Sequence, residues 1–425
     1  MKLHLLMTGN ELMSGVTVDS NSAMIAQMLE PLNLQVAGKV TIGDDMTRLC
    51  DEIDRLAAIS DVLLVNGGLG PTRDDLTAEA LARVAGVELE WNAESLAHLE
   101  SWCGKRAVAL NDANRKQAYL PAGVTIIPNA NGSAVGFRLR HRDCDIVCTP
   151  GVPGELRLMM ESTIVSWLRC TFPSSENVVI TRFQLFGIGE SSLQQRITEQ
   201  CPDWPPHIEL GFRAGAPTLE LKVSSFRSAH EADRRACEQR IQRCFGDYII
   251  GVGDTNLQRS VVELLTARGQ HVATAESCTG GLIAAMLTEI PGASAAYEAG
   301  YVTYSNRMKE QALGVSAQTL ATHGAVSEAV ALEMVRGCAE RSAADYAVAV
   351  TGIAGPDGGS AEKPVGTVWI AWGGNGHFRA RELYYPYTRK LFQTMVAATA
   401  LDLLRREILG LSEVPRYVRE RAPKR

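Results

Sequence analysis

The residue types best suited to chemistry lie in one short turn of the C-terminal half. It reads Glu276-Ser277-Cys278-Thr279-Gly280-Gly281. Apolar runs at 271–275 and 282–287 flank it, which predicts a strand, a tight turn and a helix. A serine at such a turn can attack a carbonyl carbon, while the N–H groups of residues 278–281 hold the oxyanion that forms. The simpler alternative makes Ser277 or Thr279 only the N-cap of the helix.

A serine nucleophile needs a neighbouring base at neutral pH. The histidines of this region have no obvious orienting carboxylate, but a buried lysine can serve because burial disfavours its charged form. Lys309 opens a predicted helix shortly after a β-rich run that contains Tyr304, whose hydroxyl could hold or relay the proton. Ser277, Tyr304 and Lys309 thus predict amide cleavage through an acyl-enzyme. The alternatives are a surface lysine, a half-buried strand tyrosine, and Cys278 as the nucleophile.

A second group of chemically suited residues follows a buried strand in the N-terminal half. The stretch 66–77 contains Gly67, Gly68, Gly70 and Thr72, and then the paired carboxylates Asp74 and Asp75. Glycines after a strand let a phosphate approach the backbone, and Thr72 or Thr77 can cap the following helix. Two carboxylates beside such a loop suit a hard cation that bridges phosphate oxygens. The alternative is that they only enrich the start of a helix.

The elements that must position these residues alternate between strands and helices. Strands are expected at 3–8, 35–41 and 61–66, with helices at 21–30, 46–59 and 77–85 between and after them, which predicts a doubly wound parallel sheet. The same alternation returns after residue 253, where a helix is expected at 257–268. There the Ser277, Tyr304 and Thr351-Gly352 loops would meet at the carboxyl ends of strands.

Between these two regions lies a block with a different pattern. It contains a strand at 178–186, helices at 190–199 and 229–245, and strands at 207–213, 218–225 and 248–250. The fold class is therefore α/β, with two three-layer αβα domains at 1–168 and 253–412. A small α+β module at 169–252 joins them, and the basic tail at 413–425 is expected to be a solvated end.

Composition excludes several classes of protein. The 425 residues are 46% hydrophobic and 21% charged, with a formal net charge of −6. No basic field points to nucleic acid, and no apolar run is long enough to span a membrane. The ten cysteines are scattered without Cys-x-x-Cys pairs or zinc spacing, which indicates reduced thiols. With no secretory signal in the N-terminal strand, we expect a cytoplasmic protein.

The C-terminal block resembles the CinA C-terminal domain, the family of nicotinamide mononucleotide (NMN) deamidases. The stretches that carry the resemblance are 275–281, 302–306 with Lys309, 324–327, 350–359 and 363–368. The resemblance implies hydrolysis of the NMN carboxamide to nicotinate mononucleotide and ammonia without a metal or other cofactor, by Ser277, Tyr304 and Lys309. The ribose phosphate would lie near Thr351 and Gly352, with Arg389 as its charge partner. The family often has an arginine four residues after this one, where the chain has Gln393.

The first block is similar to the CinA N-terminal domain, which shares the fold of the MoaB/MogA molybdopterin-binding proteins. The matching pieces include 9–12, 43–45, 67–77, 114–118 and 150–155, although 132–136 lacks the family's usual proline. The resemblance implies hydrolysis of ADP-ribose to AMP and ribose 5-phosphate with a divalent metal (Mg, Mn or Co). The nucleotide site would comprise Glu11, Gly67, Gly68, Gly70, Thr72, Asp74 and Asp75, with Asp44 and Asp75 as metal ligands. The middle block stands where the family has a KH-like module, but it lacks a Gly-x-x-Gly clamp and a basic face, so RNA binding is not expected.

The two resemblances together imply a bifunctional enzyme of pyridine nucleotide salvage. NMN deamidase would reside in the C-terminal domain and ADP-ribose pyrophosphatase in the N-terminal domain. We expect small-molecule substrates, no nucleic acid or membrane partner, and a homodimer. The alternative is a non-enzymatic protein, either a molybdopterin-like-binding protein or a competence-related scaffold, in which one half or neither half is active.

Overall fold

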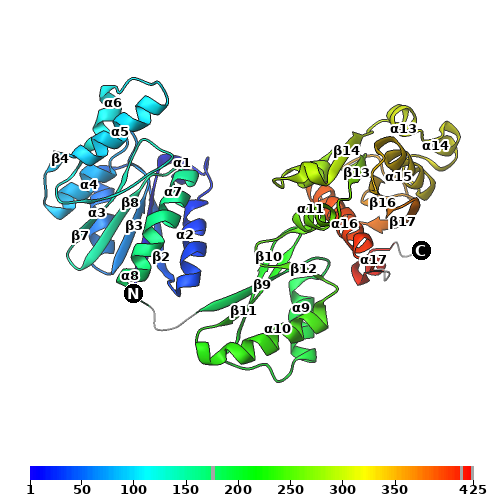
Figure 1. Ribbon diagram of the computed structural model, residues 1–425, viewed down its shortest axis with the longest axis horizontal. Coiled ribbons are helices and arrows are strands. Elements are labelled where there is room, and N and C mark those ends of the chain that lie inside the picture. The colour runs from blue at the N-terminus through cyan, green and yellow to red at the C-terminus, as the bar shows by residue number, and fades with distance from the viewer. Residues whose placement is uncertain (174–177, 412–414, 423–425) are drawn as a thin grey trace. The chain divides into compact units, whose positions relative to one another are not determined.

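The computed structural model describes residues 1–173, 178–411 and 415–422 (Figure 1). Within these residues no helix is long and apolar enough to cross a membrane. The chain divides into two compact units. One comprises residues 1–179 and 226–228, and the other comprises 180–225 and 229–425.

The first unit is built on a six-stranded mixed sheet in the order β2-β1-β3-β8-β7-β6. Strands β2, β1, β3 and β8 run parallel, whereas β7 is antiparallel to both of its neighbours, β8 and β6, so the prediction of a wholly parallel sheet is wrong at this edge. The strands are β1 (Leu3–Thr8), β2 (Val36–Ile42), β3 (Val62–Asn66), β6 (Thr125–Ile127), β7 (Gly136–His141) and β8 (Cys144–Thr149).

Alternate residues of the central strands build a core on each face of this sheet. Leu5 packs with α2 and α7 on one face, and Leu6 packs with α3 and α4 on the other. This confirms a three-layer αβα domain. Its helices are α1 (Asn10–Met13), α2 (Asn21–Leu29), α3 (Met46–Ala57), α4 (Thr77–Ala85), α5 (Ala93–Lys105), α6 (Asp112–Arg115), α7 (Pro153–Met159) and α8 (Val165–Thr171), and a separate ribbon pairs β4 (Leu89–Trp91) with β5 (Tyr119–Pro121).

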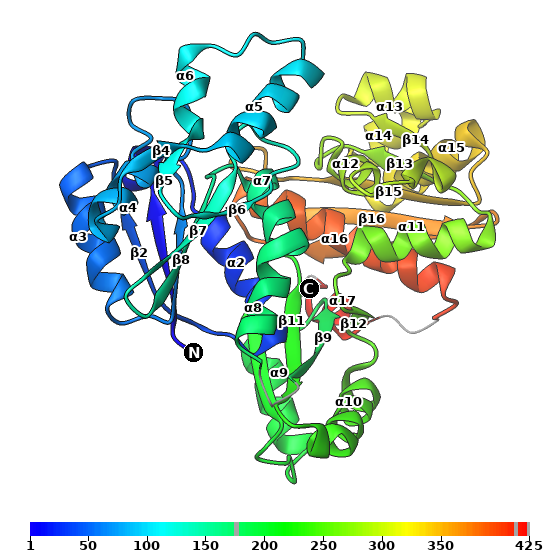
Figure 2. The same cartoon turned by 60° about the vertical axis from the view of Figure 1, so that its left-hand side comes forward.

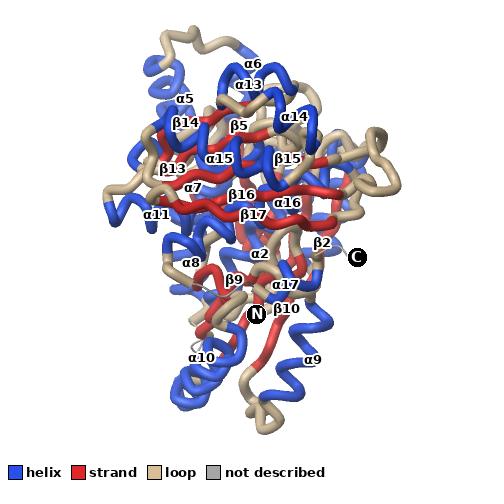
Figure 3. Tube along the Cα trace, turned by 90° about the vertical axis from the view of Figure 1, so that its right-hand side faces the viewer, coloured by secondary structure: helices blue, strands red, loops and turns tan. Residues whose placement is uncertain are grey.

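The second unit contains a five-stranded sheet in the order β14-β13-β15-β16-β17, whose strands lie side by side in Figure 3. The first three strands are parallel, and β16 is antiparallel to both of its neighbours, β15 and β17; a two-residue hairpin joins β16 to β17. The strands are β13 (Val272–Glu276), β14 (Tyr297–Val302), β15 (Tyr346–Gly352), β16 (Thr367–Gly374) and β17 (His377–Tyr384).

Two helical layers cover this sheet. Helices α11, α12 and α16 pack on one face, where α11 and α16 lie side by side (Figure 2), and α13, α14 and α15 pack on the other. Val348 and Val350 of β15 point into the first core, and Ala347 and Ala349 point into the second. The helices are α11 (Leu257–Arg268), α12 (Leu282–Thr288), α13 (Asn306–Leu313), α14 (Ala317–His323), α15 (Glu328–Ser342) and α16 (Arg389–Ile408).

The α+β module predicted between the two domains forms a four-stranded sheet in the order β10-β11-β9-β12, with two helices packed on it. Its elements are β9 (Val179–Leu185), α9 (Glu190–Gln200), β10 (Glu209–Ala214), β11 (Leu219–Ser225), α10 (Glu231–Phe245) and β12 (Ile249–Val252). The module is not independent of the C-terminal domain. Phe186 and Ile250 belong to the same core as Leu257 and Tyr417.

The expectation of a solvated tail at 413–425 is wrong for part of it. Residues Arg416–Glu420 form helix α17, in which Tyr417 and Val418 are buried while Arg416 and Arg419 stay exposed. The tyrosine ring packs edge-on against Phe186 and its hydroxyl donates to Asp402, so apolar contacts hold the segment down despite its charge. Residues 412–414 and 423–425 lie outside the described residues.

Candidate active site

Three parallel strands deliver the predicted catalytic loops to one edge of the C-terminal sheet. Glu276 at the end of β13 is in register with Val302 at the end of β14 and with Val350 near the end of β15. The turn that begins at Ser277, the segment 303–305 and the loop after Gly352 therefore leave the sheet on the same side. This confirms that the predicted catalytic loops gather at the carboxyl ends of the strands.

Ser277 and Lys309 meet at this edge of the sheet. The Lys309 Nζ lies 3.0 Å from the Ser277 Oγ, although the two residues are separated by 31 others. Lys309 is 1% exposed and Ser277 is 8% exposed. The reading of Lys309 as a surface lysine is thus wrong, because α13 turns this face of the helix toward the sheet.

The surroundings of the lysine favour its neutral form. Its Nζ also donates to the main-chain oxygen of Thr303 at 2.8 Å and approaches that of Tyr304 at 3.5 Å. These neighbours are neutral acceptors, and burial lowers the pKa of Lys309 below its usual value of 10.5. A lysine that loses its proton readily, within hydrogen-bond distance of a serine hydroxyl, has the geometry of a general base.

Glu276 organises the serine turn, and sequence reasoning missed it. Its carboxylate is fully buried and accepts hydrogen bonds from the Thr279 hydroxyl and from the N–H groups of Gly281, Ile283 and Ala284, at 2.7–3.1 Å. These are the orphan donors at the start of α12, which a carboxylate satisfies while complementing the helix dipole. The sequence signal for this role was an acidic residue, Glu276, placed five residues before Gly281, a glycine with positive φ at the start of the helix.

This network changes the prediction for the oxyanion site. The N–H of Gly281 is bound to Glu276, and that of Gly280 is bound to the Ser277 carbonyl. The N–H groups of Cys278 and Thr279 face the Cys278 sulfur, a weak acceptor, and among the described residues neither donates to a main-chain oxygen of a turn or loop. Of the four predicted donors, only these two remain to hold an oxyanion.

Cys278 does not have the properties of a nucleophile. Burial raises the pKa of its thiol to about 12, so the reactive thiolate is absent at neutral pH. Its main-chain oxygen accepts a hydrogen bond from Gln393 at 2.9 Å, which ties the turn to helix α16. Gln393, which stands where the family often has an arginine, therefore helps to position the serine turn in this chain.

Tyr304 and Arg389 form a pair at the mouth of the site. The Tyr304 hydroxyl accepts a hydrogen bond from Arg389 at 2.8 Å, and the same guanidinium donates to the Gly355 carbonyl at 2.8 Å. Tyr304 is 60% exposed. Its hydroxyl is thus engaged by Arg389, and its contact with Lys309 is made through the main chain, which supports direct proton transfer between Lys309 and Ser277 over the predicted relay.

Thr351 and Gly352 have structural contacts that explain their residue types. The buried Thr351 hydroxyl donates to the Ala325 carbonyl at 2.8 Å. A Cβ on Gly352 would lie 2.8 Å from the Thr367 carbonyl oxygen, so only glycine fits beside β16. The Thr351 hydroxyl is therefore already engaged within the protein, and the place of the ribose phosphate near these residues stays a prediction.

The glycine loop of the first unit borders a pocket. Gly68, Gly70 and Asp75 line it together with Lys116, whose Nζ donates to the carbonyls of Thr72 and Asp75. The predicted Glu11 is exposed in α1, and its carboxylate lies beside Gly9. Gly67 packs against the Thr8 carbonyl, and the Asp74 carboxylate is fully exposed, with hydrogen bonding by Thr72 as the main cause of its lowered pKa.

The two predicted metal ligands are engaged by protein donors. Asp44 accepts from the Thr8 hydroxyl and the Asn10 N–H, and Asp75 accepts from the N–H and hydroxyl of Thr72. Among the described residues, no three His, Cys, Asp or Glu side chains come together in a way that could hold a metal ion. These residues alone therefore do not fit a resident metal, and metal binding stays a prediction.

Comparisons with known proteins agree with this architecture. Residues 254–408 match the model of the CinA C-terminal domain, and residues 4–169 match that of a probable molybdopterin binding domain. A CinA-like protein of Colwellia psychrerythraea is 50% identical over 424 residues, which cover 99% of this chain and 98% of that protein. A CinA-like protein of Citrifermentans bemidjiense is 39% identical and covers 98% and 99% of the two chains.

A solved structure is similar over part of the chain. The competence/damage inducible protein CihA from Agrobacterium tumefaciens shares 48% identity, covers 37% of this chain and 94% of its own, and superposes with a TM-score of 0.35. The family assignment rests on the full-length relatives and the two domain matches. The chain belongs to the CinA family, with a molybdopterin-binding-type domain followed by a CinA C-terminal domain.

Proposed function

We propose that the C-terminal domain hydrolyses the carboxamide of NMN to give nicotinate mononucleotide and ammonia. One observation carries the proposal, namely the buried Lys309 Nζ at 3.0 Å from the Ser277 Oγ. A serine–lysine pair that is shielded from solvent suits acyl transfer, because the lysine can accept the hydroxyl proton and later return it.

The reaction proceeds in two halves. Neutral Lys309 accepts the Ser277 proton as the Oγ attacks the carboxamide carbon, and the carbonyl oxygen becomes an oxyanion facing the N–H groups of Cys278 and Thr279. The C–N bond then breaks, Lys309 delivers the proton to the leaving nitrogen, and ammonia departs from a nicotinyl ester of Ser277. A water molecule attacks this ester with Lys309 as its base, and the proton returns to the Ser277 Oγ as the carboxylate product leaves.

The mouth of the site supplies the substrate contacts in this proposal. Arg389 is exposed at the start of α16, and a guanidinium there suits the phosphate of a mononucleotide. The exposed ring of Tyr304 offers an aromatic face beside it for the pyridine ring. Tyr304 is thus assigned to substrate binding.

We further propose that the N-terminal domain hydrolyses ADP-ribose to AMP and ribose 5-phosphate with a divalent metal. The supporting observation is the pocket where Lys116 lies beside the glycine loop and Asp75, since a pyrophosphate needs both a cation and close backbone approach. NMN and ADP-ribose both arise from NAD breakdown, so a role in NAD salvage would explain why the two domains are fused. We propose that the protein acts as a homodimer in the cytoplasm.

A single set of assays tests both activities. Purified protein is incubated with NMN and with ADP-ribose, each with and without EDTA, and products are followed by chromatography and ammonia release. Ammonia formed from NMN in EDTA, absent with Ser277→Ala, supports the deamidase, and AMP formed only with metal supports the pyrophosphatase. Failure of either substrate to react refutes that half of the proposal, and failure of both favours a scaffold.

A further inference from the structure

The junction between the α+β module and the C-terminal domain contains cavities that neither proposed activity uses. Helix α17 packs against the loop 187–189, which follows β9 and leads into α9. Gly187 has φ +83°, and a Cβ there would lie 2.2 Å from the Tyr417 ring, so glycine is required for this close contact. Tyr417 is in turn fixed by Phe186 and Asp402.

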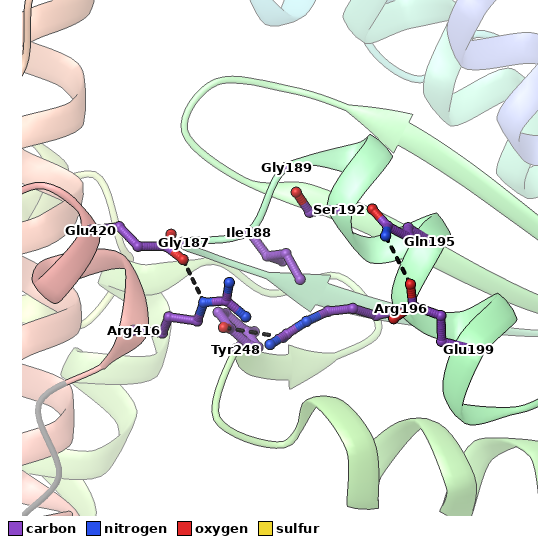
Figure 4. A pocket seen from close by; sticks show the side chains of 10 residues that line it. All are labelled: Gly187, Ile188, Gly189, Ser192, Gln195, Arg196, Glu199, Tyr248, Arg416 and Glu420. Carbon is purple, nitrogen blue, oxygen red and sulfur yellow. Dashed lines mark hydrogen bonds and ion pairs between the residues drawn. The ribbon is translucent and has the colours of Figure 1, made fainter.

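Two neighbouring cavities flank this contact and share Arg196, Tyr248 and Arg416 in their walls. The first, of about 250 Å³, is bounded by the loop 187–189 and α9 (Figure 4). The second, of about 440 Å³, is bounded by the end of α10 and by the segment 415–419. In Figure 4 the side chains of Arg196 and Arg416 extend toward each other beside Tyr248.

Arginines from four helices converge on these cavities. The five are Arg196 of α9, Arg243 of α10, Arg406 of α16, and Arg416 and Arg419 of α17. Three carboxylates share the walls, namely Glu199, Asp247 and Glu420. The basic groups come from parts of the sequence more than 200 residues apart, which is why no basic face was visible in the sequence of the module.

Two of these arginines are already committed within the protein. Arg406 is buried and binds the Asp402 carboxylate at 2.8 Å and the Asp247 carbonyl, while Arg416 pairs with Glu420. Arg196 reaches only the Tyr248 hydroxyl, at 3.3 Å, and the face of its ring. Across residues 1–173, 178–411 and 415–422, no carboxylate forms an ion pair with Arg196, Arg243 or Arg419.

We propose that this junction binds a phosphate-bearing anion, held by the guanidinium groups of Arg196, Arg243 and Arg419. The planar fork of an arginine matches two phosphate oxygens, and several forks around a polar cavity select a multiply charged group. The same ligand chemistry can come from inorganic phosphates or from the phosphoryl group of a nucleotide. An anion here bridges the α+β module and the C-terminal segment, so it stabilises their contact.

Calorimetric titration of the full-length protein with inorganic pyrophosphate at physiological salt tests this proposal. Arg196→Gln/Arg419→Gln should weaken one class of pyrophosphate site by about tenfold or more, since each arginine contributes charge-assisted hydrogen bonds. The matched control Arg235→Gln/Arg259→Gln removes the same charge from arginines paired with Glu231 and Glu263, and should leave affinity unchanged. Arg243→Gln provides a second, independent loss.

Further titrations identify the source of the phosphate. Equal affinity for AMP and inorganic phosphate indicates recognition of the phosphoryl group alone, whereas tighter AMP binding that is lost in the double variant indicates a nucleotide. Unchanged pyrophosphate affinity in Arg196→Gln/Arg419→Gln, or an equal loss in the control, overturns the proposal. Binding of a short single-stranded RNA without any binding of pyrophosphate would also overturn it. These readouts do not depend on either proposed enzyme activity.

Discussion

Lys309 is buried, and its Nζ lies 3.0 Å from the Ser277 Oγ and within hydrogen-bond distance of the Thr303 carbonyl oxygen. Transfer of its ammonium from water into this site disfavours the charge, so burial lowers the pKa of Lys309 and makes the neutral, proton-accepting form easier to reach. The chemistry at this site therefore depends on the protonation state of one amine.

The pH dependence of NMN hydrolysis should report this amine. Because the pKa of Lys309 is lowered, its neutral form is present above that pKa, and kcat/KM should be lost as pH falls through a value below 10.5. Lys309→Arg should be inactive from acid to alkaline pH, because a guanidinium keeps its proton. If Lys309→Arg kept a near-normal kcat/KM for NMN across the pH range, Lys309 would not be the general base.

The choice between the adjacent serine and cysteine is also testable. Cys278→Ala should keep turnover within about threefold, since its thiol, with a pKa of about 12, is protonated at working pH. Ser277→Ala should lose about a thousandfold or more in kcat. Both variants are compared by NMN turnover and by circular dichroism. The reverse order of effects would move the nucleophile to the cysteine.

Tyr304→Phe distinguishes a substrate-binding role from a proton relay. Its hydroxyl holds Arg389, so its removal should raise KM for NMN while kcat changes little. A relay would instead lower kcat at unchanged KM. Steady-state kinetics at saturating and limiting NMN separate the two, and Tyr301→Phe on the preceding strand serves as the matched control.

At the scale of elements, the start of α12 depends on a single carboxylate. Glu276 satisfies three helix N–H groups and a hydroxyl that would otherwise be buried without partners. The turn that carries Ser277 is thereby fixed between the end of β13 and the helix, and Gln393 of α16 holds it from the other side. The position of the Ser277 side chain therefore depends on β13, α12 and α16 together.

Glu276→Gln should therefore affect both stability and activity. The amide retains one acceptor oxygen but loses the charge, so we expect about 1–3 kcal/mol lower unfolding free energy and a lower kcat. Denaturant unfolding and NMN turnover measure these effects. Glu263→Gln, an exposed carboxylate on α11, should change neither, and equal behaviour of the two variants would remove the organising role from Glu276.

At the scale of the molecule, the α+β module, the C-terminal domain and α17 share one core. Phe186, Ile250, Tyr417 and Val418 pack with residues of α11 and α16 in the same cluster. The domain boundaries predicted from the sequence, after residues 252 and 412, would divide this core. The unit that the contacts define begins instead at residue 180 and includes the C-terminal segment.

Fragment stability should follow the contacts. A fragment of residues 180–425 should unfold cooperatively, whereas 253–412 lacks Phe186 and Tyr417 and leaves Asp402 without its tyrosine partner. Loss of one large buried aromatic residue costs about 3–5 kcal/mol, so the shorter fragment should be markedly less stable. Denaturant unfolding of both, beside the full chain, checks this. Equal stability would make the module a separate domain.

Local sequence patterns determined most of the elements and their order. Apolar periodicity placed β1 and α4 at their observed bounds, and the alternation of strands and helices indicated two αβα domains. The strand–turn–helix around Ser277 and the helix that contains Lys309 could also be predicted from the sequence, because each depends on residues close together in the chain. Motifs within such segments were enough to nominate the nucleophile and its base.

Tertiary structure alone decided which of these residues touch. The Arg389–Tyr304 and Gln393–Cys278 contacts join residues 85 and 115 positions apart, and no local pattern encodes them. The same holds for the burial of Tyr417 in a basic segment and for the convergence of arginines at the module junction. Periodicity reports which face of an element is apolar. Its packing partner depends on how all the buried faces fit together, so it emerges only when the whole chain has folded.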